Sequence, residues 1–167
     1  MKFLARKIFN RIARNPPVVK KDLSIPEEFH GSDYGGWTIA SNKLNEKSVV
    51  YSFGIGEDTT FDLSIINKFN CTVYGFDPTP KVVSSLESSR IPDKFQFHPL
   101  AISDRDGFET FYPPENPEHI SHSNIPTSDN DVGIKVRCAQ LSTICKNLGH
   151  EKIDLLKMDV EGLNIAY

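Results

Sequence analysis

Residues 49–61, VVYSFGIGEDTTF, decide the fold of this chain. Their apolar, β-branched and aromatic first half predicts a buried strand, and two glycines, Gly54 and Gly56, then permit a sharp turn. Apolar residues recur after this turn at the spacing of a helix, at Phe61, Ile65, Ile66 and Phe69. A second apolar run, residues 72–76, predicts another strand that stops at Asp77. Strand, glycine turn, helix, strand and acid are typical of the nucleotide-binding half of a Rossmann-like α/β sheet.

The residues of the glycine turn favour one class of nucleotide over another. A dinucleotide site needs a third glycine where this chain has Thr59, and it places a pyrophosphate at the helix N-terminus. Glu57 and Asp58 carry negative charge there, which disfavours a pyrophosphate and favours a cationic group such as a sulfonium. Asp77 is placed to accept hydrogen bonds from ribose hydroxyls. We therefore predict S-adenosylmethionine as the cofactor, with an ordinary βαβ unit as the alternative.

A last apolar segment, residues 153–158, predicts a strand that delivers Asp159 and Glu161. If this strand lies beside the first one, where the strand order of the sheet reverses, Asp159 faces the glycine turn. A carboxylate there could hold the methionine end of the cofactor, orient a substrate hydroxyl or act as a general base. Lys157 lies inside the apolar strand, and we expect it to pair with Asp159 or Glu161. All three are candidate catalytic residues; a structural ion-pair cluster is the alternative.

The segment at residues 30–37, HGSDYGGW, is dense in glycine and aromatic residues. Tyr34 and Trp37 could cover a ligand, and His30 is a candidate for proton transfer. The alternative is a turn whose tryptophan packs at the edge of the core.

The middle of the chain predicts the rest of the sheet. Thr79 and Pro80 mark the start of a helix, and residues 95–102 alternate as a third strand. Residues 108–112 and 134–140 alternate like strands and could pair as a hairpin, with a long polar loop between them that we interpret as a substrate-side lid. Ser142 is expected to cap the helix that follows.

No metal site is predicted. His119 and His122 in the polar loop are spaced as possible ligands, but no cysteine or acid stands at a matching offset.

Four segments of the chain resemble the FkbM-like family of S-adenosylmethionine-dependent methyltransferases. They are residues 51–58 (YSFGIGED), 76–80 (FDPTP), 101–107 (AISDRDG) and 153–162 (IDLLKMDVEG), and the resemblance covers roughly residues 30–167. The chain departs from the family at Ser52, where the first strand usually ends in an acid, and at Gln140-Leu141, where Leu-Asp is frequent. The predicted cofactor-binding residues are Phe53, Gly54, Ile55, Gly56, Glu57, Asp77 and Pro78, joined through the resemblance by Ala101, Ile102, Ser103 and Asp104 beside the adenine.

The resemblance also implies a reaction, the methylation of a hydroxyl on a sugar or other small metabolite. The family's sheet continues with several strands beyond Gly162. We therefore expect a Rossmann-like sheet truncated after about the fourth parallel strand, with a β-hairpin excursion and with weak or absent catalysis. Residues 153–158 would form an exposed edge that could self-associate. The alternatives are a non-catalytic binding module and, disfavoured by Thr59 and the acids after the turn, a nicotinamide-dependent oxidoreductase.

Composition divides the 167 residues into two unequal parts. Residues 1–28 predict a basic amphipathic helix and an extended linker, and residues 29–167 a partial methyltransferase domain. The helix, residues 1–15, could make a weak contact with a membrane surface or be merely solvated.

The net charge is −3, and the acidic remainder of the chain argues against nucleic acid as a partner. Three cysteines without metal-like spacing favour a reducing compartment, so we expect a cytoplasmic protein with a small-molecule acceptor.

Overall fold

A parallel sheet of four strands forms the centre of the computed structural model, which describes residues 24–112 and 132–160. The strands are β3 (Val49–Phe53), β4 (Thr72–Phe76), β5 (Phe95–His98) and β9 (Leu155–Met158), in the order β5-β4-β3-β9. The predicted N-terminal helix, the loop with His119 and His122, and Glu161 lie outside the described residues. The architecture is mixed α/β and compatible with a Rossmann-like fold.

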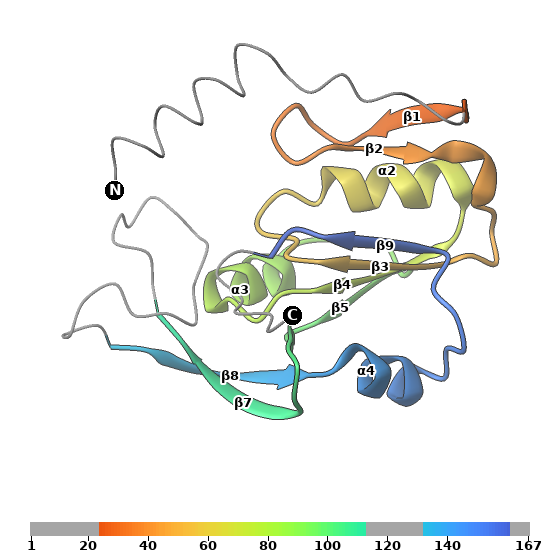
Figure 1. Ribbon diagram of the computed structural model, residues 1–167. Coiled ribbons are helices and arrows are strands. Elements are labelled where there is room, and N and C mark those ends of the chain that lie inside the picture. Colours follow the sequence, from red (N-terminus) through yellow and green to blue (C-terminus); the bar gives the residue numbers. More distant parts are fainter. Residues whose placement is uncertain (1–23, 113–131, 161–167) are drawn as a thin grey trace, which may run out of the picture.

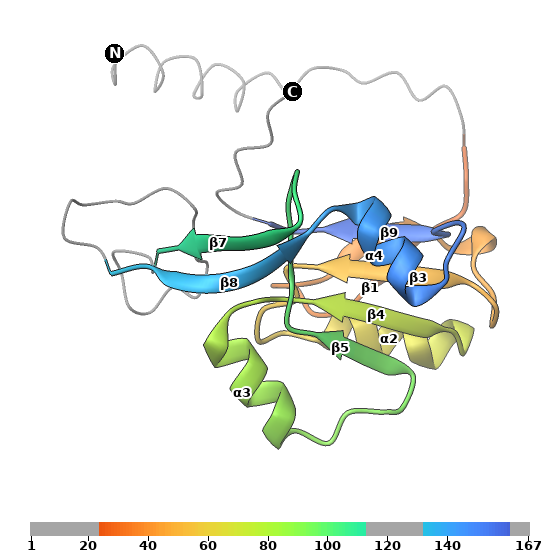
Figure 2. The same cartoon turned by 90° about the horizontal axis from the view of Figure 1, so that it is seen from below.

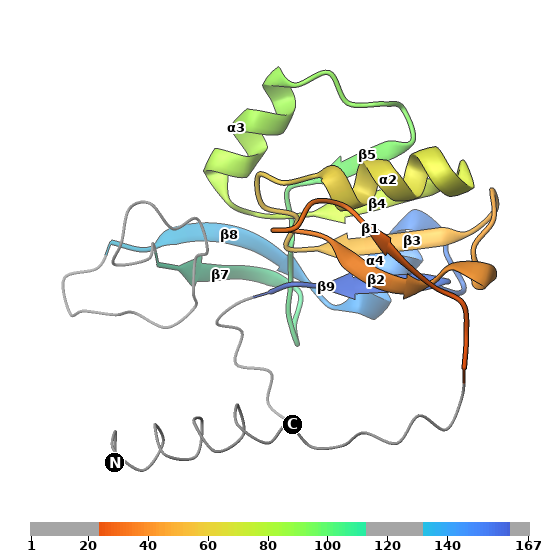
Figure 3. The same ribbon diagram turned by 90° about the horizontal axis from the view of Figure 1, so that it is seen from above.

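Helices and hairpins cover both faces of this sheet (Figure 1). On one face lies α2 (Thr60–Phe69), against which the hairpin of β1 (Glu27–His30) and β2 (Trp37–Ala40) packs, as the view from above shows (Figure 3). On the other lies α4 (Leu141–Leu148), seen from below in Figure 2. The remaining elements are η1 (Ser41–Lys43), α3 (Pro80–Ser88), β6 (Ala101–Ile102), β7 (Gly107–Phe111) and β8 (Ile134–Ala139).

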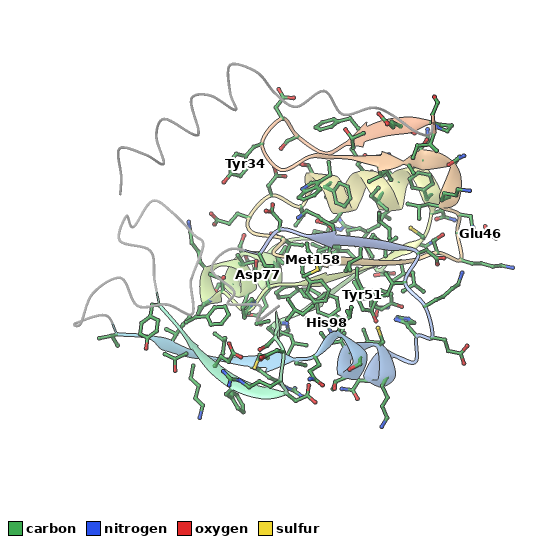
Figure 4. The ribbon with its side chains drawn as sticks, viewed as in Figure 1. Tyr34, Glu46, Tyr51, Asp77, His98 and Met158 are labelled. Atoms are coloured by element: carbon green, nitrogen blue, oxygen red, sulfur yellow. The ribbon has the colours of Figure 1, made fainter. Side chains whose placement is uncertain are left out.

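Alternate residues of β3 fill two separate hydrophobic layers. Val50 joins the cluster formed with α2, whereas Tyr51 and Phe53 join the cluster formed with α4. In the second layer Phe53 stacks on Phe76, with ring centroids 4.5 Å apart. This alternation is expected of a strand whose two faces are both covered. Figure 4 shows Tyr51 and His98 on the α4 side of the sheet.

The strand–turn–helix–strand unit is confirmed, and so is the place of the last strand. β9 pairs with β3 in parallel, with Val50 opposite Leu155 and Ser52 opposite Lys157. The strand order therefore reverses between β3 and β9, and ligands of open α/β sheets bind at such a point, beyond the carboxyl ends of the strands. Self-association through β9 stays a prediction.

Two local predictions were wrong. The third strand does not run from 95 to 102: β5 ends at His98, and β6 belongs to a second sheet with β8 and β7. Pro99, which has no N–H to donate to a ladder, separates the two strands. Ser142 does not cap α4 either, because the helix already begins at Leu141 after its N-cap Gln140.

Asp106 takes the role expected of Ser142. Its carboxylate accepts hydrogen bonds from the Gln140 N–H, at 2.9 Å, and from the Thr143 hydroxyl, at 2.8 Å. These hydrogen bonds lower the pKa of Asp106, since they favour its charged form. The predicted hairpin is confirmed, with β7 and β8 antiparallel.

No helix among residues 24–112 and 132–160 is both long and apolar enough to cross a membrane. In the same residues, no group of three histidine, cysteine or acidic side chains comes together as a metal site.

Candidate functional site

The glycine turn after β3 meets the end of β9 in direct backbone contact. Gly54 and Gly56 both adopt positive φ, at +68° and +58°, which glycine tolerates without strain. The Gly54 N–H donates to the Phe76 carbonyl at 2.9 Å, and the Asp159 N–H donates to the Phe53 carbonyl at 3.0 Å. A Cβ atom on Gly54 would lie 1.9 Å from the Asp159 carbonyl oxygen. Only glycine therefore allows the turn and the end of β9 to come this close.

Asp77 ties the glycine turn to the end of β4. It is 6% exposed, and its two carboxylate oxygens accept hydrogen bonds from the Gly56 N–H at 3.0 Å and the Thr79 N–H at 2.9 Å. Each carboxylate oxygen can accept a further hydrogen bond, so two acceptor positions remain for a ligand's hydroxyl groups. Figure 4 shows Asp77 near the end of the sheet from which the glycine turn leaves.

The two acids after the turn have partners. Glu57 forms an exposed ion pair with Lys81 at 2.9 Å. Asp58 accepts hydrogen bonds from the Thr60 N–H at 2.9 Å and the Thr60 hydroxyl at 2.6 Å, and also from the Ser32 hydroxyl. Burial alone would raise the pKa of Asp58, but these hydrogen bonds outweigh it and lower the pKa. Asp58 thus stays charged at the start of α2, while the N-cap Thr59 makes no side-chain cap bond.

The residues predicted beside the adenine sit on the second sheet. Ala101 and Ile102 form β6, and the Ser103 N–H donates to the Ala139 carbonyl at 3.0 Å. Ile102 packs against the cluster that contains Phe53 and Phe76. Asp104 is exposed, and among the described residues its side chain makes polar contacts with the side chains of its neighbours Ser103 and Arg105. No hydrogen bond or ion pair in the described part of the chain joins Asp104 to Asp77.

Asp159 and Lys157, two of the predicted catalytic residues, do not form the expected ion pair with each other. Asp159 is exposed just after β9. Lys157 is 6% exposed and makes no ion pair with Asp159 within the described ranges, while its other predicted partner, Glu161, lies outside them. Lys157 Nζ instead donates to the Gly54 carbonyl at 3.3 Å. It also lies 5.9 Å from each of the ring centroids of Trp37 and Phe61.

His30 lies in the packing of β1 on α2. It is 3% exposed, its Nδ1 lies 2.8 Å from the Ser64 hydroxyl, and its ring centroid lies 5.7 Å from that of Phe69. These contacts bury the imidazole beneath the hairpin rather than presenting it at the glycine turn.

Asp62, a buried acid of α2, was not among the site residues predicted from the sequence. It is fully buried on the inner side of α2, and burial raises its pKa to about 6 despite the nearby Ser52 hydroxyl and Lys157. In the described part of the chain, the two carboxylate oxygens of Asp62 and the hydroxyl oxygen of Ser52 have no hydrogen-bond partner. The sequence could have indicated this burial, because Asp62 stands three and four positions before Ile65 and Ile66, on the apolar side of the helix.

Comparison with known proteins identifies the family of the chain. Residues 42–165 match the model of the methyltransferase FkbM domain. The chain therefore belongs to the FkbM methyltransferase family, as its motifs predicted.

Two curated relatives carry the same name, "Probable methyltransferase-like protein 24". The human protein is 32% identical over 126 residues, which cover 75% of this chain and 28% of that protein. The rat protein is 32% identical over 113 residues, or 67% of this chain and 25% of that protein. The chain thus spans about a quarter of the length of the curated relatives it matches. No solved structure matches it significantly.

Proposed function

We propose that the chain forms the cofactor-binding part of an S-adenosylmethionine-dependent methyltransferase that acts on a hydroxyl of a sugar or other small metabolite. The observation that carries the proposal is Asp77, a nearly buried carboxylate that binds the glycine turn with one hydrogen bond to each oxygen among the described residues, so that each oxygen has the capacity to accept a second one. A vicinal pair of ribose hydroxyls can use both of these acceptor positions. Family membership supports the methyltransferase class, and the acceptor comes from the resemblance alone.

The residues at the turn fit this cofactor. A Cβ atom on Gly56 would meet nothing within 4 Å, so the backbone of the turn is open to close approach by a ligand at this position. Glu57, Asp58 and Asp159 give the region negative charge, which suits a sulfonium better than a phosphate.

Asp159 is the described acid best placed to act on the acceptor. When bound, S-adenosylmethionine supplies a methyl group on a positively charged sulfur that departs as a neutral thioether. The acceptor oxygen must approach in line and lose its proton to a base. Asp159 is exposed where β9 meets the glycine turn, so its carboxylate can orient the hydroxyl and take that proton.

Ligand binding tests the proposal directly. Adenosylhomocysteine at about 100 times its dissociation constant is expected to stabilise the folded chain by about 2.7 kcal/mol. The measurement is thermal unfolding followed by titration calorimetry, with NADH as the comparison ligand. A larger shift with NADH, or no shift with adenosylhomocysteine, would contradict the proposed cofactor.

Substitution of Asp77 tests the residue that carries the proposal. Asp77→Ala is expected to weaken adenosylhomocysteine binding by about 2 kcal/mol or more, because charge-assisted hydrogen bonds are lost. The variant should also be less stable, since the N–H groups of Gly56 and Thr79 lose their acceptor. Calorimetry at a temperature where the variant is folded gives the affinity. Asp104→Ala is the control with the smaller effect, and equal affinities of both variants and the wild type would remove Asp77 from the site.

A further inference from the structure

Three polar side chains are buried together on the α2 face of the sheet. Ser52 and Asp62 are fully buried, and Lys157 is 6% exposed. Ser52 and Lys157 are register partners on β3 and β9, so their side chains project side by side toward α2. Asp62 lies on the buried side of α2, and the Ser52 hydroxyl and the Lys157 charge both lower the pKa of its carboxyl against the larger effect of burial.

Burying three polar side chains together costs free energy of folding. A buried charge must be paired or hydrogen-bonded, and a well-packed apolar set in its place would often be as stable or more stable. The surrounding residues hold the ammonium of Lys157 without a direct ion pair in the described part of the chain. The rings of Trp37 and Phe61 lie at cation–π distance, and the charges of Asp58 and Asp62 are close enough to interact with it.

The hydrogen bond that Lys157 makes is directed at the glycine turn. Its Nζ donates to the carbonyl of Gly54, on a residue whose own N–H is fixed by the Phe76 carbonyl. Two positions later, the Gly56 N–H is fixed by Asp77. The turn is thus held at three points, by backbone, by Asp77 and by Lys157.

We propose that Lys157 is a positioning residue, which holds the Gly54 carbonyl and so keeps the glycine turn in the conformation that receives the cofactor, while the rings of Trp37 and Phe61 flank its ammonium. This assignment replaces the catalytic role that the sequence suggested for Lys157. It rests on the proposed function only where the cofactor is concerned. The effect on the turn itself is a property of the free protein.

Lys157→Met, which keeps an unbranched side chain of similar size and removes its charge and donor, tests the assignment in the 167-residue chain. Two properties are measured: the dissociation constant of adenosylhomocysteine and the native-state hydrogen exchange of the Gly56 amide. We expect the dissociation constant to rise at least about tenfold, since a charged hydrogen bond supports the turn. We also expect the Gly56 amide to exchange at least about tenfold faster.

Two further variants separate positioning from general stability. Lys152→Met removes a lysine of an exposed ion pair with Asp154, ahead of β9, and both properties should stay within about twofold of the wild type. The double variant Asp62→Asn with Lys157→Met removes both buried charges, and it should regain thermal stability relative to Lys157→Met. Its affinity and its Gly56 exchange should remain impaired, because the donor to Gly54 is still missing.

Recovery of affinity and Gly56 protection together with stability in the double variant would overturn the proposal, and so would a wild-type exchange rate in Lys157→Met. If the wild-type chain binds no adenosylhomocysteine, the proposed function fails, and Gly56 exchange alone still decides the role of Lys157.

Discussion

Gly54→Ala is expected to lower the free energy of unfolding by about 2–5 kcal/mol and to abolish adenosylhomocysteine binding. Two costs add up. A residue with a Cβ at φ +68° costs roughly 1–2 kcal/mol, and overpacking costs about 1–3 kcal/mol more. The second cost applies because the new Cβ would lie 1.9 Å from the oxygen and 2.7 Å from the carbon of the Asp159 carbonyl. Relief of that overlap must push β9 away from β3. Denaturant unfolding and calorimetry measure the two effects.

Gly56→Ala is the matched control for this experiment. Gly56 has nearly the same φ, +58°, but a Cβ there meets nothing within 4 Å. Only the backbone cost remains, so the expected loss is about 1–2 kcal/mol. Equal losses of stability in the two variants would show that the approach of Asp159 to Gly54 is looser than described.

The second large effect concerns pH and Asp62. The folded pKa of about 6 exceeds the ordinary value of 3.8, so at intermediate pH the folded chain binds more protons than the unfolded chain. Stability due to this group therefore falls as pH rises. Relative to Asp62→Asn, the wild type is expected to lose about 2 kcal/mol of unfolding free energy between about pH 4 and about pH 7.5. Denaturant unfolding of both proteins across that range gives the difference.

Asp154→Asn is a control of opposite sign. Hydrogen bonds from Lys152 and from the Val49 N–H lower the pKa of Asp154. The stability that Asp154 contributes is therefore present above its unfolded pKa and lost as pH falls through its folded pKa. Parallel pH profiles for the two variants would mean that Asp62 titrates like an exposed acid.

Much of the fold could be predicted because its signals are local. The strand–turn–helix–strand unit has an apolar run, two glycines and a helical repeat within thirty residues, and each of these favours the same structure. The place of β9 followed from a topological rule. The break of the third strand at Pro99 could be read from the sequence as well, but the alternation on both sides of it favoured one continuous strand.

The candidate site was only partly predictable, because its side chains form hydrogen bonds with residues that are distant in sequence. Asp77 was found from its position after a strand, yet its bond to Gly56 depends on the path of the turn. The same holds for Lys157. A lysine in an apolar strand predicts a hydrogen-bond or ion-pair partner, but the sequence does not identify that partner. Its hydrogen bond crosses 103 positions to Gly54, and nearer acids were the natural expectation.

The hairpin of β1 and β2 lies before residue 42, where the match to the family begins. It nevertheless supplies the Ser32 hydroxyl to Asp58, the ion pair of Glu28 with Lys68 at 3.1 Å, and Ile39 to the hydrophobic core. The segment that matches the family model is therefore smaller than the segment whose side chains pack together. A shortened protein that began at residue 42 would uncover one side of α2 and lose the hydrogen bond from Ser32 to Asp58, so a domain boundary drawn there by homology would separate residues that pack against one another.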